Sequence, residues 1–181
     1  DGITLIPLEY AGRGKKYGQP FYSTFDELTH SMSEEIAGML GPSEPYCLFG
    51  HSMGAYAAIE TAYQMQKVHH NAPVMTILSG AASPYVAAKQ KVGMSNEEMI
   101  AYLRDIGGTE ENVLKNRIFE TELLPILQAD LDTLRTYRFA HEGELLPSYL
   151  VATYGQEDLA YRIGQVEDWK TAVGTDVVMQ T

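Results

Sequence analysis

A serine stands at the centre of residues 50–54, which read Gly-His-Ser-Met-Gly. This spacing is typical of the nucleophile elbow, a sharp turn between a strand and a helix that lifts a serine hydroxyl above the end of a sheet. An apolar run precedes the turn and an alanine-rich helical segment follows it, which is the context that the turn requires. The pattern therefore predicts Ser52 as a nucleophile for acyl transfer.

Two neighbouring features would support that chemistry. Met53 begins the helix after the turn, so its backbone N–H is expected to face the developing oxyanion with the helix dipole behind it. Asp158 follows a later strand-like run, and a carboxylate there can accept the N–H of an imidazole and stabilise the imidazolium. Glu157 competes for this role, and the alternative for Asp158 is a solvated loop side chain.

The histidine base of such a site has no clear candidate. The order expected for this kind of turn places the base after the next strand, which begins near Val177. Five histidines are present, and four of them are predicted to lie at helix ends or on the surface. His51 is beside the serine, with its side chain expected to turn away, and His30 is on an earlier helix. His69 and His70 end the helix that follows the serine. Only His141 is worth testing as a base.

Alternating strands and helices are predicted to position these residues. Continuous apolar runs indicate buried strands of a mostly parallel sheet with helices on both faces, an α/β fold. We expect one domain over residues 1–181, with a helical insertion at about 83–141 where no strand is evident. The predicted strands are 3–8, 46–49, 74–78, 149–154 and one from 177. The predicted helices are 24–40, 55–68, 95–106, 109–116, one or two over 120–137, and 165–173.

Composition excludes several classes of function. The net charge of −11 argues against nucleic acid as a partner, because phosphate binding needs clustered Lys and Arg. No apolar run approaches the roughly 18 residues of a membrane helix. The single cysteine, Cys47, excludes an internal disulfide and is predicted to be buried. No spacing of Cys or His suits zinc, and Gly12-x-Gly14 lacks the third glycine of a dinucleotide fingerprint.

Several landmarks in order resemble one enzyme family. The first two landmarks are residues 7–14, which end in Gly-Arg-Gly, and the elbow at residues 49–55. The next two are residues 103–109, which read Leu-Arg-Asp-Ile-Gly-Gly-Thr, and residues 124–130 together with Tyr137 and Arg138. The last is an acidic loop at residues 155–158. In this arrangement the chain resembles the type II (editing) thioesterases of nonribosomal peptide and polyketide synthesis. The likeness covers nearly the whole chain.

The resemblance implies a cytoplasmic α/β-hydrolase with a helical lid. Its task would be to remove acyl groups from the phosphopantetheine arm of acyl or peptidyl carrier proteins, as a monomer and without a cofactor of its own. Ser52 carries over as the nucleophile, Asp158 as the triad acid, and the Met53 N–H as one oxyanion donor. Met94, Met99 and Leu103 could line an acyl pocket, or they could form only the core of the lid.

Two family segments have no counterpart in this sequence. One is a loop resembling Phe-Pro-Tyr-Ala-Gly-Gly that supplies the second oxyanion donor, and the other is a Gly-Gly-His segment that bears the catalytic histidine. We therefore expect both ends of the sequence to be cropped. Two alternatives stay open: a small-molecule carboxylesterase on the same fold, and a non-catalytic relative that only binds carrier proteins.

Overall fold

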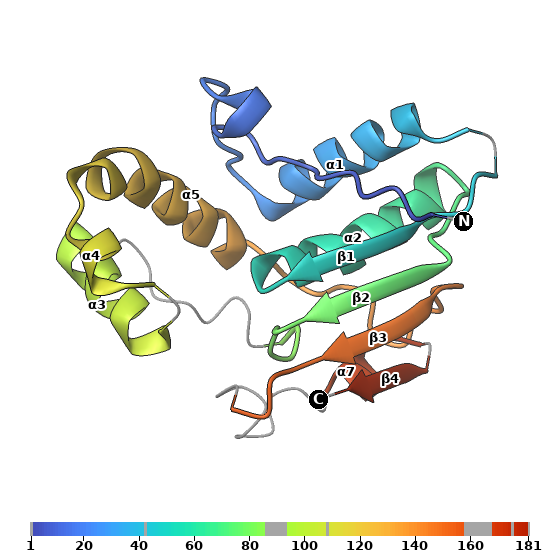
Figure 1. Ribbon diagram of the computed structural model, residues 1–181. Helices are drawn as coiled ribbons and strands as arrows, with labels where there is room; N and C mark the ends of the chain where they lie inside the picture. Colours follow the sequence, from blue (N-terminus) through green and yellow to red (C-terminus); the bar gives the residue numbers. More distant parts are fainter. Residues whose placement is uncertain are drawn as a thin grey trace.

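The computed structural model describes residues 2–41, 43–85, 94–107, 109–157, 168–174 and 176–180. Within these residues lies a parallel sheet whose strands follow one another in chain order (Figure 1). Ser79 pairs with His51 on one side and with Thr153 on the other, so the carboxyl ends of three strands meet at one edge. The strands are β1 (Cys47–His51), β2 (Met75–Ser79), β3 (Tyr149–Thr153) and β4 (Val177–Gln180).

The helices that pack on this sheet within the described residues lie on one of its faces. Helix α2 (Met53–Val68) packs on β1 and β2, and α1 (Phe25–Met39) packs on α2 (Figure 1). Thr24 caps α1 by accepting a hydrogen bond from the N–H of Glu27 at 3.2 Å. The short helix α7 (Trp169–Ala172) lies in the region predicted as helix 165–173, of which residues 165–167 are outside the described ranges.

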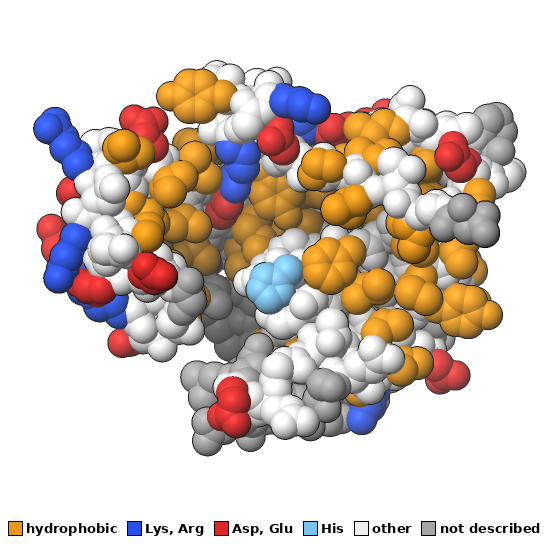
Figure 2. Space-filling view, viewed as in Figure 1, with side chains coloured by type: hydrophobic (Ala, Val, Ile, Leu, Met, Phe, Trp, Pro, Cys, Tyr) orange, Lys and Arg blue, Asp and Glu red, His pale blue; other side chains and the backbone are white. Residues whose placement is uncertain are grey.

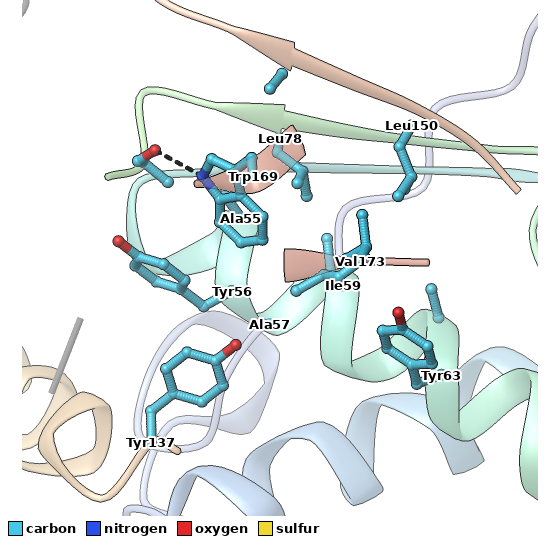
Figure 3. Close-up of a cluster of buried hydrophobic side chains, with 14 of the residues drawn as sticks. Ala55, Tyr56, Ala57, Ile59, Tyr63, Leu78, Tyr137, Leu150, Trp169 and Val173 are labelled. Carbon is cyan, nitrogen blue, oxygen red and sulfur yellow. Dashed lines mark hydrogen bonds between the residues drawn. The ribbon is translucent and has the colours of Figure 1, made fainter. Parts of the chain in front are cut away.

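The main hydrophobic core lies between α2 and the sheet. Ala55 and Ile59 of α2 are fully buried against Leu78 and Leu150 of the strands (Figure 3). Trp169 is also fully buried, and its indole N–H donates to the carbonyl oxygen of Ala81 at 3.1 Å. Small alanines on α2 let the helix approach the strands closely, which explains the alanine-rich sequence after the elbow.

The opposite face of the sheet carries exposed apolar side chains. Phe49 is 64% exposed, Tyr149 72% and Val178 55%, and Figure 2 shows hydrophobic side chains gathered over the strands. Helices were expected on both faces, and in the described ranges they cover one. Because successive side chains alternate between faces, Cys47 shares the open face with Phe49. The prediction that Cys47 is buried is therefore wrong: it is exposed.

Residues 2–10 form no strand, so the strand predicted over 3–8 is wrong in this structure. Ile3 is fully exposed and Leu5 is 86% exposed. The apolar pattern of this segment favours a strand, but strand geometry also needs a ladder of hydrogen bonds with a neighbour. Among the described residues the segment joins no such ladder.

The chain leaves the sheet after β2, forms a group of helices and returns at β3 (Figure 1). We call this group, set to one side of the sheet, the helical insertion. It has its own small core, in which Met99, Leu103 and Leu124 are buried. Its elements are α3 (Asn96–Ile106), α4 (Glu111–Leu114), the π-helical η3 (Phe119–Leu123) and α5 (Leu124–Arg135).

Candidate active site

Ser52 sits at the turn between β1 and α2 with a left-handed backbone, φ 53° and ψ −120°. Such a conformation is rare for a residue with a side chain and is characteristic of strained functional turns. The turn is tight enough to demand glycine at Gly50, because a Cβ there would lie 1.9 Å from the carbonyl oxygen of Gly54. The nucleophile elbow predicted from the sequence is thus present in its backbone geometry.

The elbow is fixed to the neighbouring strand. The N–H of Ser52 donates to the carbonyl oxygen of Ser79 at 2.8 Å, and the Ser52 carbonyl accepts from Ala55 at 3.0 Å as α2 begins. Ser52 itself is exposed, whereas Met53 is half-buried. Met53 is the first residue of a 16-residue helix, and the N–H groups of a first turn have no partner within the helix. The arrangement can therefore stabilise negative charge beside the Ser52 hydroxyl.

Tyr10, which the sequence did not single out, reaches the same turn from the N-terminal segment. Its hydroxyl oxygen lies 3.8 Å from the place where a Cβ on Gly54 would sit. Burial raises the pKa of Tyr10 to about 12, and the nearby Asp130 carboxylate adds to the rise against the opposing Arg13. The phenol therefore stays protonated at neutral pH.

Asp158, the predicted triad acid, lies outside the described residues. The loop that leads to it starts at the active edge, because Thr153 at the end of β3 pairs with Ser79, which in turn pairs with His51. Adjacent strands are about 4.8 Å apart, which places the start of this loop about 10 Å from the elbow. Glu157, the competing carboxylate, is exposed.

The histidines stand apart from the Ser52 hydroxyl. His51 is exposed and its Nδ1 lies 3.1 Å from Ser79 Oγ. His141 lies against Glu60, eight residues beyond Ser52 and so about 12 Å along α2. Within the described ranges no histidine nitrogen hydrogen-bonds to Ser52, so the structure does not bring His141 to the nucleophile.

His141 belongs instead to a partly buried polar group that sequence reasoning missed. Its Nε2 lies 2.8 Å from Glu60 Oε2, and its Nδ1 lies 2.8 Å from Glu144 Oε2. Lys67 donates to Glu144 at 2.9 Å, and the hydroxyl of Tyr137 donates to Glu60 at 3.0 Å. We call these five side chains the Glu60 cluster. Residues far apart in sequence meet here, so no local pattern reveals it.

Burial by itself lowers the pKa of His141, but hydrogen bonds to Glu60 and Glu144 and the attraction of Glu60 outweigh it. The pKa of His141 is therefore raised above its ordinary value, despite the opposing charge of Lys67. Hydrogen bonds from Lys67 and then His141 lower the pKa of Glu144. The ion pairs and hydrogen bonds of the Glu60 cluster thus hold the segment that follows the helical insertion against α2.

The suggested pocket residues lie within the helical insertion. Met99 is 1% exposed and Leu103 9% exposed, both in the insertion's own core, and Met94 packs against that core partly buried. Figure 2 shows a hollow between the insertion and the sheet, with hydrophobic side chains along the insertion's side. Whether Met94, Met99 and Leu103 contribute to an acyl pocket stays a prediction.

Neither a metal site nor a membrane-spanning helix is found among the described residues. Among them, no group of three His, Cys, Asp or Glu side chains is arranged to hold a metal ion. No helix in the same ranges has the length and apolar character to cross a membrane.

A parallel sheet, a serine at positive φ after β1 and a helix starting at that serine define the α/β-hydrolase fold. The Thioesterase domain family matches residues 1–180, and the chain belongs to this family. One relative is the medium-chain S-acyl fatty acid synthase thioesterase of Rattus norvegicus, 25% identical over 178 residues. That match covers 94% of this chain but 65% of the relative, so the chain spans less than two thirds of that enzyme.

Solved structures agree with this fold. ClbQ from the colibactin NRPS/PKS pathway superposes with a TM-score of 0.81 at 23% identity, over 100% of this chain and 76% of ClbQ. YbtT, a type II thioesterase from the yersiniabactin NRPS/PKS pathway, gives a TM-score of 0.77 at 23% identity, over 96% of this chain and 70% of YbtT. The resemblance to thioesterases that the sequence motifs indicated is confirmed.

Proposed function

We propose that this protein is a thioesterase that hydrolyses acyl groups from the phosphopantetheine arm of carrier proteins, through an acyl-enzyme on Ser52. The observation that carries the proposal is the backbone of Ser52, held at positive φ between β1 and the start of α2. Membership of the thioesterase family supports the reaction class. Likeness to proteins named for NRPS/PKS pathways supports carrier-bound substrates.

The reaction proceeds in two halves. In this proposal a histidine base, which none of the described histidines supplies, is oriented by Asp158 and takes the proton from Ser52 Oγ as this oxygen attacks the thioester carbonyl carbon. The carbonyl oxygen becomes negative and accepts a hydrogen bond from the Met53 N–H. The intermediate collapses, the C–S bond breaks, and the thiol leaves with the proton. Water then attacks the acyl-serine by the same route, which releases the carboxylic acid and restores Ser52.

The helical insertion acts in this proposal as a lid over the acyl group. It lies beside the hollow in Figure 2 and carries its own apolar core, to which Met99 and Leu103 belong. A closed lid excludes water from the site until the acyl-enzyme is formed. The chemistry needs no resident cofactor, because the carrier protein brings the phosphopantetheine.

The test compares three substrates with the whole protein and its Ser52→Ala variant: an acyl group on a carrier protein, the same acyl group on free pantetheine, and its p-nitrophenyl ester. We expect fastest turnover of the carrier-bound thioester and none with Ser52→Ala. A preference for the p-nitrophenyl ester would instead identify a carboxylesterase. Binding of the carrier protein without turnover of any substrate would identify a non-catalytic relative.

A further inference from the structure

A bidentate ion pair joins the loop before α1 to the helical insertion. Arg13 Nη1 donates to Asp130 Oδ2 at 2.7 Å, and Nη2 donates to Oδ1 at 2.5 Å. The side chains are 27% and 20% exposed, so solvent screens the pair only in part. Two parallel N–H···O bonds fix the orientation of the groups as well as their distance. The pair therefore holds α5 in one position relative to the loop.

Asp130 lies where α5 passes from the main core into the insertion. The next turn of α5 is anchored to the core side: the Thr133 hydroxyl donates to the carbonyl oxygen of Tyr22 at 2.9 Å, and Thr136 Oγ1 accepts from the Phe25 N–H at 2.8 Å. The other end of α5, at Leu124, is buried in the core of the insertion. Arg13 thus holds the helix at the point from which the insertion projects.

The same arginine is linked to the nucleophile elbow through Tyr10. The guanidinium carbon of Arg13 lies 5.2 Å from the centroid of the Tyr10 ring, a cation–π contact. Tyr10 packs against the main core, and its hydroxyl oxygen lies 3.8 Å from the place where a Cβ on Gly54, two residues after Ser52, would sit. Contacts therefore run from Asp130 through Arg13 to Tyr10, whose hydroxyl lies beside the elbow.

We propose that Arg13 is a positioning residue for acyl binding: by holding Asp130 and Tyr10 together, it fixes the helical insertion beside the elbow and so sets the affinity for long acyl groups. This inference rests on the proposed function and adds to it a determinant of acyl-chain length. A short acyl group would touch the insertion little, whereas a long one must lie against it, so the two respond differently to a displaced insertion.

The test measures kcat and KM of the whole protein for acetyl- and decanoyl-pantetheine. In Arg13→Gln we expect the ratio of the decanoyl KM to the acetyl KM to rise by up to roughly fivefold, the upper end of the range for an ion pair that solvent partly screens. Asp130→Asn should give the same rise, and the double variant no further rise, because both changes remove one interaction. Arg13→Lys keeps the positive charge but cannot form a bidentate pair, so its KM ratio should lie between those of Arg13→Gln and the wild type.

The matched control is Arg104→Gln. Arg104 makes a similar bidentate pair with Glu111, at 2.8 Å for both hydrogen bonds, but this pair lies entirely within the helical insertion. This variant should leave the KM ratio unchanged. An equal KM ratio in Arg13→Gln and the wild type, or the same shift in Arg104→Gln, would overturn the proposal.

Amide hydrogen exchange separates this proposal from the proposed function. In Arg13→Gln, exchange in α3 and the first turns of α5 should accelerate, whereas exchange in α2 should not. Unchanged exchange there would overturn the positioning role whether or not the wild type hydrolyses thioesters. Failure of the wild type to turn over either thioester would refute the proposed function, and with it the role of Arg13 in acyl binding.

Discussion

The backbone N–H of Ser52 donates to the carbonyl oxygen of Ser79 at 2.8 Å, which ties the nucleophile elbow to the end of the adjacent strand. The link continues across the sheet, because the N–H of Gly80 donates to the carbonyl oxygen of Thr153 at 2.9 Å. The left-handed conformation of Ser52 costs about 1–3 kcal/mol and persists only where its surroundings enforce it. Here the tied strand ends supply that constraint.

Gly50 should be essential to the elbow. In Gly50→Ala the new Cβ would meet the backbone of Gly54, with 1.9 Å to its carbonyl oxygen, and a backbone atom cannot move aside as a flexible side chain can. We expect the free energy of unfolding to fall by about 1–3 kcal/mol, measured by urea denaturation. Reaction at Ser52 should slow as well, because the turn must distort.

Gly38→Ala is the matched control for that change. Gly38 lies within α1, is exposed, and has open space where a Cβ would be built. Alanine is favoured over glycine inside a helix by about 0.5–1 kcal/mol, so this variant should be more stable than the wild type. Equal effects of the two substitutions would contradict the steric account of Gly50.

The Glu60 cluster should make stability depend on pH. The folded pKa of His141 is raised above its ordinary 6.5, so its stabilising contribution is fully present below pH 6.5 and is lost as the pH rises through the raised value. We expect the wild type to lose unfolding free energy between about pH 5.5 and about pH 8.5. In His141→Gln this loss should be much smaller, as measured by urea denaturation at both pH values.

Two comparisons sharpen this test. His30 is exposed on α1, so His30→Gln should keep the pH dependence of the wild type. Glu144 has a lowered pKa, so its contribution is present above its ordinary 4.5 and is lost as the pH falls through the lowered value. The contribution of the cluster to the free energy of unfolding is therefore largest between pH 4.5, the ordinary pKa of Glu144, and pH 6.5, the ordinary pKa of His141. A His141→Gln variant whose free energy of unfolding depends on pH as in the wild type would show that His141 does not stabilise the fold through the Glu60 cluster.

Asp158 and Glu157 can be separated as triad acids by isosteric amides. With Asp158 as the acid, Asp158→Asn should lower kcat on the order of ten thousand-fold, because the base loses its orienting carboxylate. Glu157→Gln should change kcat less than about twofold, since an exposed loop side chain contributes little. The opposite pattern in steady-state kinetics would assign the role to Glu157.

Local signals predicted most of the fold. The elbow depends on a few neighbouring residues, and the structure has it; the cap at Thr24 and the capping box at Ser95 are equally local features. Helix 109–116 was predicted too long, since α4 spans only Glu111–Leu114. The stretch 120–137 divides into η3 and α5, with Pro125 in the first turn of α5, where a missing N–H costs nothing.

Contacts between distant residues could not be predicted in this way. The pairing of Arg13 with Asp130 spans 117 residues, and that of Glu60 with His141 spans 81. A single sequence shows only separate charged residues at these positions, each of which suits a solvated surface. The exposure of Cys47 also depends on which face of the sheet is covered, a property that the apolar run alone does not contain.

The identity of the nucleophile is tested most directly by the intact mass of the whole protein after treatment with a fluorophosphonate. We predict one adduct per chain in the wild type and none in Ser52→Ala, because the reagent phosphonylates only an activated serine at the elbow. An adduct that persists in Ser52→Ala, or a wild type that forms no adduct, would contradict the assignment of Ser52.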